Sequence, residues 1–358
     1  MKFYIVGSPW HLIIAAAIHL RAGEKGLFLL EEISDTSLKS MIFICERLKL
    51  DYKFIGSISR VRFHHLKLNK IFSFVKRVYH EFESVEEGFS EICALYSPNT
   101  VYYFNINSPI TRKQLLVSSK LQLKLVRVED GICDYFGFPF VHYSISHRVM
   151  KRLFSALIGL DVLYRNGSDS FQKRTSEYLL FFPKIRNSNR IKKSNLLVYK
   201  KNIVEVIQLL ASLNKDVLSI NLNESSLIIG QTLFEDNLTS LDEEVKVYVK
   251  AAKKIGGLVY YKPHPRTSPE KIKKLSTIDS FTIIDIACPV EELLVMFKFN
   301  VVVGMWSNTI FYSEPLFDTK SYSLINNINI KGGHVNKILR FIKENMSNHV
   351  TILNDLDG

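Results

Sequence analysis

The alternation of strand-like and helix-like stretches constrains the fold of this chain more than any other feature. In the first half, β-prone runs from Lys2–Val6 to Leu121–Val128 are separated by stretches whose apolar residues recur at helical spacing. In the second half, runs from Ser225–Ile229 to Lys320–Leu324 repeat the pattern. Repeated alternation of this kind predicts parallel sheets covered by helices. We therefore expect an α/β protein built from two Rossmann-like domains that face a cleft.

Length and composition agree with a two-domain globular protein. A chain of 358 residues is long enough for two domains with cores of their own. The polar, basic stretch Lys184–Asn195 and the helix-like Asn202–Leu213 are expected to carry the crossover between the halves. We accordingly predict an N-terminal domain over 1–190 and a C-terminal domain over 191–358. Hydrophobic residues make up 47% and charged residues 23% of the chain, which excludes a disordered protein.

Nothing in the sequence has the pattern of a membrane span or an export signal. The longest early apolar run, Leu12–Ile18, is far shorter than the ~20 residues that a span needs. Met1-Lys2 leads directly into a strand-like run, unlike a signal peptide. The four cysteines are scattered: Cys45, Cys93, Cys133 and Cys288. Their spacing fits neither a metal site nor a disulfide framework, so we expect a cytoplasmic protein with free thiols.

The positive charge of the chain calls for a partner or a surface. The net charge is +12, and the basic side chains concentrate in three segments: Arg60–His80, His147–Leu160 and Lys184–Lys193. Such segments suit an anionic membrane surface or a nucleic acid, and solvated helix faces are the simpler explanation. Because no nucleic-acid-binding signature accompanies them, we expect no nucleic acid partner and favour a membrane surface.

Two motifs place proton-handling side chains just after predicted strands. Glu129-Asp130-Gly131 follows the apolar run Leu123–Val128, and His264-Pro265 follows Leu258–Tyr261. Open α/β sheets bind their ligands at these carboxyl ends. A carboxylate from one half and an imidazole from the other would then serve as base and acid. An ordinary acidic turn and a basic surface turn are the structural alternatives.

The residues around the histidine indicate a phosphate site. Pro263 and Pro265 fix the backbone on both sides of His264, and Lys262 and Arg266 add positive charge. A histidine held in this way can donate a proton to a leaving phosphate oxygen, while the cations neutralise the charge of that oxygen.

Three further groups follow strands or begin helices in the second half. Ser307-Asn308-Thr309 follows a glycine strand exit and offers hydroxyls and backbone N–H groups to an anion. Gly230-Gln231 offers another glycine turn at the same sheet edge. Glu291, at a helix start, could accept hydrogen bonds from ribose hydroxyls. The structural alternatives are a helix cap, a turn and a first-turn acid.

Together these motifs resemble those of the bacterial sialyltransferases, in particular glycosyltransferase family 52 and the related bacterial polysialyltransferases. The shared elements, in this order along the chain, are Glu129-Asp130-Gly131, His264-Pro265 and Ser307-Asn308-Thr309. The resemblance extends from the Gly7-Ser8-Pro9 loop to the C-terminal helices and so covers most of the chain.

The resemblance implies a GT-B enzyme that moves sialic acid from CMP-sialic acid to a glycan, with inversion and without a metal or another cofactor. Glu129 or Asp130 would deprotonate the acceptor hydroxyl. His264 would donate a proton or a hydrogen bond to the departing CMP phosphate. The residues implied to bind substrate are Ser8, Gly230, Gln231, Lys262, Pro265, Arg266, Glu291, Ser307, Asn308 and Thr309.

The identity of the base stays open at this point. Some members of family 52 carry an acid directly after the glycine turn that corresponds to Gly230. Here Gln231 stands in that place, and Glu235 and Asp236 follow slightly later, so both are reserve candidates. The family further implies a lipooligosaccharide or capsular acceptor, a peripheral position on the inner membrane and a homodimer.

Two other functions fit the same residues. A transferase for another CMP-activated acidic sugar, such as Kdo, would make similar phosphate and cytidine contacts. A non-catalytic basic protein that binds glycans or nucleic acid would explain the charge alone. Stabilisation by cytidine nucleotides separates both transferases from the binding protein.

Overall fold

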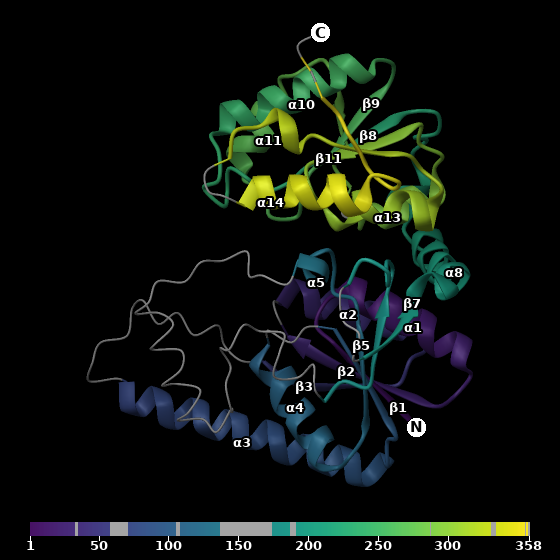
Figure 1. Cartoon of the computed structure of the whole chain (residues 1–358), viewed down its shortest axis with the longest axis vertical. Coiled ribbons are helices and arrows are strands. Elements are labelled where there is room, and N and C mark those ends of the chain that lie inside the picture. Colours follow the sequence, from purple (N-terminus) through teal and green to yellow (C-terminus); the bar gives the residue numbers. More distant parts are fainter. Residues whose placement is uncertain are drawn as a thin grey trace. The chain divides into compact units, whose positions relative to one another are not determined.

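A computed structural model of the chain describes residues 1–32, 35–57, 71–104, 108–136, 174–186, 191–286, 288–330, 334–354 and 356. The chain divides into two compact units, Met1–Ile203 and Val204–Gly358, each of them built around one parallel sheet (Figure 1). The first unit extends beyond the expected boundary at residue 190 because strand β7 (Lys192–Asn195) pairs with β6 (Glu177–Leu180) in its sheet.

The first unit contains a seven-stranded parallel sheet in the order β3-β2-β1-β4-β5-β6-β7. Its remaining strands are β1 (Lys2–Val6), β2 (Gly26–Glu32), β3 (Tyr52–Ser57), β4 (Thr100–Tyr103) and β5 (Lys124–Val128). Its helices are α1 (Pro9–Ala22), α2 (Asp35–Leu48), α3 (Ile71–Tyr96), α4 (Pro109–Lys120), α5 (Cys133–Phe136) and the 3₁₀ turn η3 (Leu196–Tyr199). Helix α8 (Lys200–Ser212) leads into the second unit.

The second unit contains a six-stranded parallel sheet in the order β10-β9-β8-β11-β12-β13. Its strands are β8 (Ser226–Ile229), β9 (Val259–Lys262), β10 (Thr282–Ile283), β11 (Val301–Gly304), β12 (Ser321–Ser323) and β13 (Thr351–Ile352). Its helices are α9 (Lys215–Leu218), α10 (Leu241–Ile255), α11 (Pro269–Leu275), α12 (Val290–Met296), α13 (Asn308–Phe317) and α14 (His334–Phe341), with the short turns η4 (Ile325–Asn327) and η5 (Ile342–Met346).

Both sheets have the strand order of a Rossmann fold. In each, the chain builds outward from a central strand to one edge and then returns to pair on the other side of that strand. The two switch points lie between β1 and β4 and between β8 and β11. Ligands of such folds bind outside the carboxyl ends of the strands at this point. The predicted α/β class with two Rossmann-like domains is therefore confirmed.

The apolar run Leu12–Ile18 lies in helix α1, in the interior of the first unit. All seven of these residues are buried, so the helix is covered on more than one side, and it packs against β1, α2 and η3. Ser8 caps its first turn, and Gly23 ends it with a left-handed φ of 63°. None of the helices within the described ranges is long and apolar enough to cross a membrane.

The expected basic segments are largely outside what the structure describes. Residues 58–70 and 137–173 carry no description, and of residues 71–79 only the helical backbone of α3 is described. The segments Arg60–His80 and His147–Leu160 therefore stay predictions.

Candidate active site

Residues from three loops and a helix start gather at the carboxyl edge of the second sheet. Gly230 follows β8, His264 follows β9, and Ser307 follows β11 at the beginning of α13. Glu291 lies in the first turn of α12 and contacts the α13 start. The structure thus places the predicted donor-side residues along the edge that contains the switch point of their own unit.

His264 is held by its own loop. Its Nδ1 accepts the backbone N–H of Arg266 at 3.0 Å, and its carbonyl oxygen accepts the N–H of Thr267 at 2.8 Å. A ring nitrogen that accepts is unprotonated, so this contact assigns the proton of the neutral imidazole to Nε2. Burial and the charge of Arg266 lower the pKa of His264, which favours the neutral form. His264 therefore offers an Nε2–H donor.

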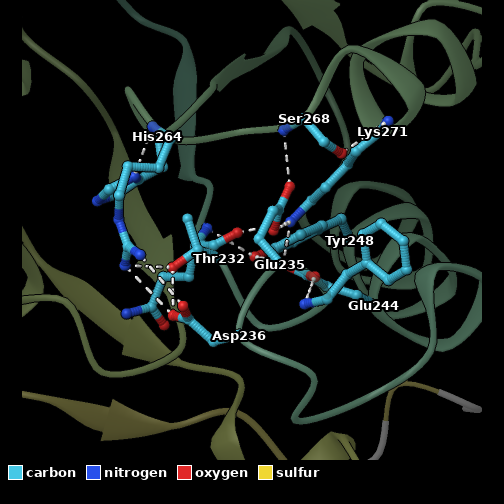
Figure 2. A network of polar contacts seen from close by, with 11 residues as sticks. Thr232, Glu235, Asp236, Glu244, Tyr248, His264, Ser268 and Lys271 are labelled. Atoms are coloured by element: carbon cyan, nitrogen blue, oxygen red, sulfur yellow. Dashed lines mark hydrogen bonds and ion pairs between the residues drawn. The ribbon is translucent and has the colours of Figure 1, made fainter. Parts of the chain in front are cut away.

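The guanidinium of Arg266 is bound within the second unit. Nη1 and Nη2 donate to the carboxylate of Asp236 at 3.1 and 3.3 Å, and Nη2 also donates to Thr232 Oγ1 at 2.9 Å. Burial acts to raise the pKa of Asp236, but the hydrogen bonds from Thr232 and Arg266 hold it below its usual value. Asp236 thereby ties the His264 loop to the loop after β8, as Figure 2 shows. The neighbouring Pro265 is exposed.

A second network beside this one is centred on Lys271 (Figure 2). Its ammonium is fully buried and donates to Glu244 Oε1 and to the carbonyl oxygen of Gln231, both at 2.5 Å, and to Glu235 Oε2 at 3.3 Å. Glu235 Oε1 also accepts the N–H of Ser268 at 2.8 Å. Burial acts to raise the pKa of Glu235, but the Ser268 N–H and the Lys271 charge hold it below its usual value. Glu235 therefore joins α11 to the loop after β8.

Gln231 is anchored from three directions. Its N–H donates to Tyr248 Oη at 3.1 Å, its carbonyl oxygen accepts from Lys271, and its Oε1 accepts the N–H of Trp306 at 3.1 Å. The last bond joins the loops after β8 and β11 across the switch point. Gln231 thus positions the loop that presents Ser307.

Gly230 is required by packing and not by a special backbone angle. A Cβ atom at this position would lie 2.3 Å from Tyr261 Oη and 2.7 Å from Tyr261 Cζ, and the Tyr261 side chain is fully buried. The Gly230 N–H donates to the Lys262 carbonyl oxygen at 2.9 Å. The Lys262 ammonium donates to the Ile286 carbonyl oxygen, and burial lowers its pKa. Both residues therefore shape the edge next to His264.

Ser307 and Thr309 have different partners at the start of α13. Ser307 Oγ accepts the N–H of Thr309 at 3.3 Å and caps the helix, which leaves the Ser307 hydroxyl proton uncommitted among the described residues. The Thr309 hydroxyl donates to Glu291 Oε1 at 3.1 Å. Burial raises the pKa of Glu291 against this hydrogen bond. Ser307 can therefore donate to an anion, whereas Thr309 orients Glu291; Asn308 is the first residue of the helix.

In the first unit, exposure separates the two acids of the Glu129-Asp130-Gly131 motif. Glu129 is 1% exposed, and its Oε2 accepts the N–H of Phe181 at 2.7 Å and the hydroxyl of Tyr135. The side chain of Asp130 is 35% exposed, and its Oδ1 lies 2.5 Å from His11 Nε2. Glu129 therefore holds the loop to the end of β6, and solvent reaches Asp130.

The loop after β5 is shaped by two further residues. Gly131 has a φ of 139°, a conformation that side chains with a Cβ rarely adopt. Asp134 Oδ2 accepts the N–H of Asp130 at 2.8 Å, and Asp134 pairs with the buried Arg127. The turn that presents Asp130 thus requires a positive φ at position 131, which explains why the motif has a glycine there.

The sequence analysis did not single out His11, although its carboxylate partner was predicted. His11 lies in the first turn of α1, is 4% exposed, and stacks on Phe104 with ring centroids 4.6 Å apart. Ser8 Oγ accepts the His11 N–H at 3.2 Å, so Ser8 acts here as a helix cap. A histidine one turn after the first strand, inside an otherwise apolar run, is the signal that would have identified it.

A buried acid lies behind this pair at the end of β2. Glu31 is 5% exposed and accepts the hydroxyls of Ser108 and Thr111, the latter at 2.7 Å. Burial raises the pKa of Glu31 despite these hydrogen bonds. His11, Asp130 and Glu31 thus come from α1, the loop after β5 and the end of β2, and of these three side chains Asp130 is the one reached by solvent.

Taken unit by unit, the two edges offer complementary chemistry. The second unit offers the His264 Nε2–H, the Ser307 hydroxyl and the N-terminal N–H groups of α13 to an anion, and Glu291 to hydroxyl groups. The first unit offers the carboxylate of Asp130. Among the described residues, no three metal-ligating side chains converge on one point.

Solved structures share the whole architecture at low sequence identity. UDP-GlcNAc 2-epimerase from Methanocaldococcus jannaschii matches with a TM-score of 0.56 and 13% identity over 99% of this chain and 89% of its own. UDP-GlcNAc 2-epimerase from Neisseria meningitidis matches at 0.53 and 11%, over 99% and 95% of the two chains. MurG from Acinetobacter baumannii matches at 0.50 and 8%, over 98% and 85%. The chain is thus a pair of Rossmann-like domains of the GT-B type.

A family model identifies the particular group within this fold. The model of the alpha-2,8-polysialyltransferases (POLYST) matches residues 2–326, so the chain belongs to this family and is a glycosyltransferase of the sialyltransferase type. The matched range contains the positions of all three motifs and of His11. No curated protein matches the chain.

Proposed function

We propose that this protein transfers sialic acid from CMP-sialic acid to a glycan acceptor, with inversion and without a metal ion. The observation that carries the proposal is the joint position of His264, Ser307 and Glu291 at one sheet edge of a polysialyltransferase family member. This edge supplies donors for a phosphate next to an acceptor for ribose hydroxyls, which is the pattern that a CMP group requires.

In the proposed reaction, the acceptor hydroxyl oxygen forms a bond to the anomeric carbon of sialic acid. The bond between that carbon and the phosphate oxygen breaks on the opposite face, and its electron pair leaves with CMP. Inversion follows from this geometry. The hydroxyl proton passes to a carboxylate, and the charge that develops on the phosphate is stabilised by hydrogen-bond donors.

For the carboxylate we favour Asp130. A general base must reach the acceptor, and Asp130 is 35% exposed whereas Glu129 is 1% exposed and holds Phe181. The reserve candidates Glu235 and Asp236 are bound by cations, and their lowered pKa values make them weaker bases.

For the leaving group, the tautomer of His264 supports a hydrogen-bonding role. The neutral ring donates Nε2–H to the phosphate, and Ser307 donates its hydroxyl. The phosphate of CMP needs no full proton to depart, since its oxygens are weakly basic in comparison with an alkoxide. Gln231 and Thr309 act by positioning Ser307 and Glu291.

For the acceptor we propose a bacterial surface glycan, either a lipooligosaccharide or a capsular chain, as the resemblance of the motifs to the bacterial sialyltransferases implies. We propose that the enzyme works in the cytoplasm at the inner membrane, held there by its basic segments, and that it forms a homodimer.

The test is incubation with CMP-sialic acid and a panel of galactosyl- and sialyl-terminated acceptors, with product masses as the readout. We expect a mass increase of one or more sialic acid residues, unchanged by a metal chelator. A parallel arm with CMP-Kdo detects the other acidic sugar. The proposal is rejected if no acceptor is extended and CMP leaves the unfolding temperature unchanged.

A further inference from the structure

We propose that His11 is a positioning residue for Asp130, so that the proton-accepting group of the first unit is a hydrogen-bonded His11–Asp130 pair. The inference rests on the proposed transfer reaction and adds to it a residue from α1 that the three motifs do not contain. It starts from the 2.5 Å contact between His11 Nε2 and Asp130 Oδ1, which joins the loop after β5 to the first turn of α1.

The surroundings of the imidazole decide which member of the pair donates. His11 Nδ1 faces the backbone N–H of Gly7 at 3.5 Å, so this nitrogen acts as the acceptor. Nε2 then carries the proton of the neutral ring and donates it to Asp130 Oδ1. The ring is fixed in this orientation because it stacks on Phe104 with an interplanar angle of 13°.

Exposure decides which member reaches the substrate. The side chain of His11 is 5% exposed and both of its ring nitrogens face protein groups, whereas the side chain of Asp130 is 35% exposed. A catalytic base must lie within hydrogen-bond reach of the hydroxyl that it deprotonates. His11 therefore acts through Asp130: it fixes Oδ1 and leaves Oδ2 for the acceptor.

Charged groups surround the pair on its own loop and on a neighbouring strand. Asp134 lies on the same loop and accepts the Asp130 N–H, and it is paired with Arg127 from β5. Glu31 faces His11 from β2, with both of its oxygens bound by hydroxyls from α4. None of these neighbours donates a hydrogen bond to the Asp130 carboxylate. Among the described residues, the His11 N–H is the donor to that carboxylate.

Activity measurements on three variants test the positioning role. His11→Phe keeps an aromatic ring against Phe104 and removes the donor, and we expect kcat to fall roughly 10- to 100-fold. KM for CMP-sialic acid should stay unchanged. His11→Gln retains an N–H donor and should recover most of kcat, whereas the matched control His19→Phe, on the same helix, should leave kcat at its wild-type value.

The outcomes separate this inference from the proposed function. A wild-type enzyme without any transfer activity overturns the proposed function. An active wild type whose His11→Phe variant keeps its kcat overturns only the role of His11, as does a His11→Gln variant as slow as His11→Phe.

A measurement on the wild-type chain covers the case in which His11→Phe fails to fold. Nitrogen-15 NMR of the imidazole should show His11 protonated at Nε2, with a proton resonance far downfield that disappears in Asp130→Ala. An Nδ1-protonated ring, or a resonance that Asp130→Ala leaves in place, overturns the proposal.

Discussion

The ammonium of Lys271 lies 2.5 Å from Glu244 Oε1, and neither side chain is exposed to solvent. The pair joins α11 to α10 (Figure 2). The same ammonium also donates to the carbonyl oxygen of Gln231 in the loop after β8. Removing one partner of such a pair leaves an uncompensated charge in the interior. The pair therefore links the stability of the second unit to the position of its donor-side loop.

Replacing Lys271 by Met should destabilise the protein strongly. The change leaves Glu244 buried without its cation, which typically costs about 3–5 kcal/mol in the free energy of unfolding. Urea unfolding of the variant measures this difference. The matched control is Lys274→Met on the same helix, whose ion pair with Asp242 is solvent-exposed and should cost less than about 1 kcal/mol.

A double variant checks that the unpaired charge is the cause. Lys271→Met combined with Glu244→Leu removes both charges and should recover part of the lost stability. Equal stability of Lys271→Met and Lys274→Met would show that the buried pair contributes nothing.

Replacing His264 should lower turnover far more than stability. We expect His264→Ala to reduce kcat by ~10²–10³-fold, since it removes a donor to the charge developing on the phosphate. His264→Gln keeps an N–H donor and should retain more activity. If both variants are equally slow, His264 transfers a proton instead of donating a hydrogen bond, and a folded His264→Ala within a few-fold of wild type would remove it from the mechanism.

Two substitutions at Ser307 separate its helix cap from its hydroxyl. Ser307→Ala removes both and should cost about 1 kcal/mol of stability, whereas Ser307→Gly costs only a few tenths at a cap position. Both variants lack the donor for the phosphate, so both should weaken CMP binding, measured by calorimetry, to a similar degree. A Ser307→Gly variant that binds CMP like the wild type would assign Ser307 to the cap alone.

Glu291 should make stability depend on pH in the opposite direction to an ordinary salt-bridged acid. Burial raises the pKa of Glu291 in the folded state above its usual value of 4.5. Between the two pKa values the folded state binds more protons, so stability rises as pH falls through the raised pKa. At neutral pH the wild type bears the cost of a buried charge that Glu291→Gln lacks.

Thermal unfolding across pH measures this difference. Glu291→Gln should be more stable than the wild type near pH 7, and this advantage should shrink toward pH 4. The variant should also bind CMP more weakly, because the amide accepts fewer hydrogen bonds from ribose hydroxyls. The exposed Glu270→Gln serves as the control, and a Glu291→Gln advantage that is the same at every pH would contradict the assignment.

The sequence predicted the strands of both sheets well because parallel strands buried on both faces are continuous apolar runs. Lys2–Val6 and Ser226–Ile229 are examples, and both lie at the centre of their sheets. The strands that the analysis missed lie at or near sheet edges: Glu177–Leu180, Lys192–Asn195 and Thr351–Ile352. Lys192–Asn195 contains no apolar residue, so its side chains give no strand pattern. It is a strand because its backbone pairs with Glu177–Leu180. Residues 71–96 form one uninterrupted helix, α3.

The candidate site was predictable where chemistry and strand ends coincide, as at His264 and Glu129-Asp130-Gly131. The sequence could not show which oxygen or nitrogen atoms of each side chain remain available to a substrate once the contacts within the protein are made. Asp130 and Glu129 are adjacent in sequence, but Glu129 is buried and accepts the Phe181 N–H and the Tyr135 hydroxyl, whereas Asp130 is partly exposed and contacts His11. His11 was missed because its contact with Asp130 joins two segments far apart in the sequence.

The basic charge should serve as a membrane attachment. If Arg60–His80 docks on an anionic surface, each cation near that surface contributes ~1 kcal/mol. Replacing four of its cations by Gln should release the protein from anionic vesicles in a sedimentation assay; these are Lys67, Lys70, Lys76 and Arg77. Transfer to a small soluble acceptor should be nearly unchanged, because none of the four belongs to the proposed site.

The control for this experiment must remove the same charge elsewhere. Four exposed lysines of the second unit are suitable for Gln substitution: Lys246, Lys253, Lys254 and Lys273. If overall positive charge caused the attachment, both quadruple variants would lose vesicle binding to the same extent. If the segment Arg60–His80 itself docks, only the variant with substitutions in that segment should lose vesicle binding. High salt should release the wild type as well, since screening acts on exposed charges. Vesicle binding by the first variant that equals the wild type would mean that Arg60–His80 is not the attachment and that the positive charge has another role.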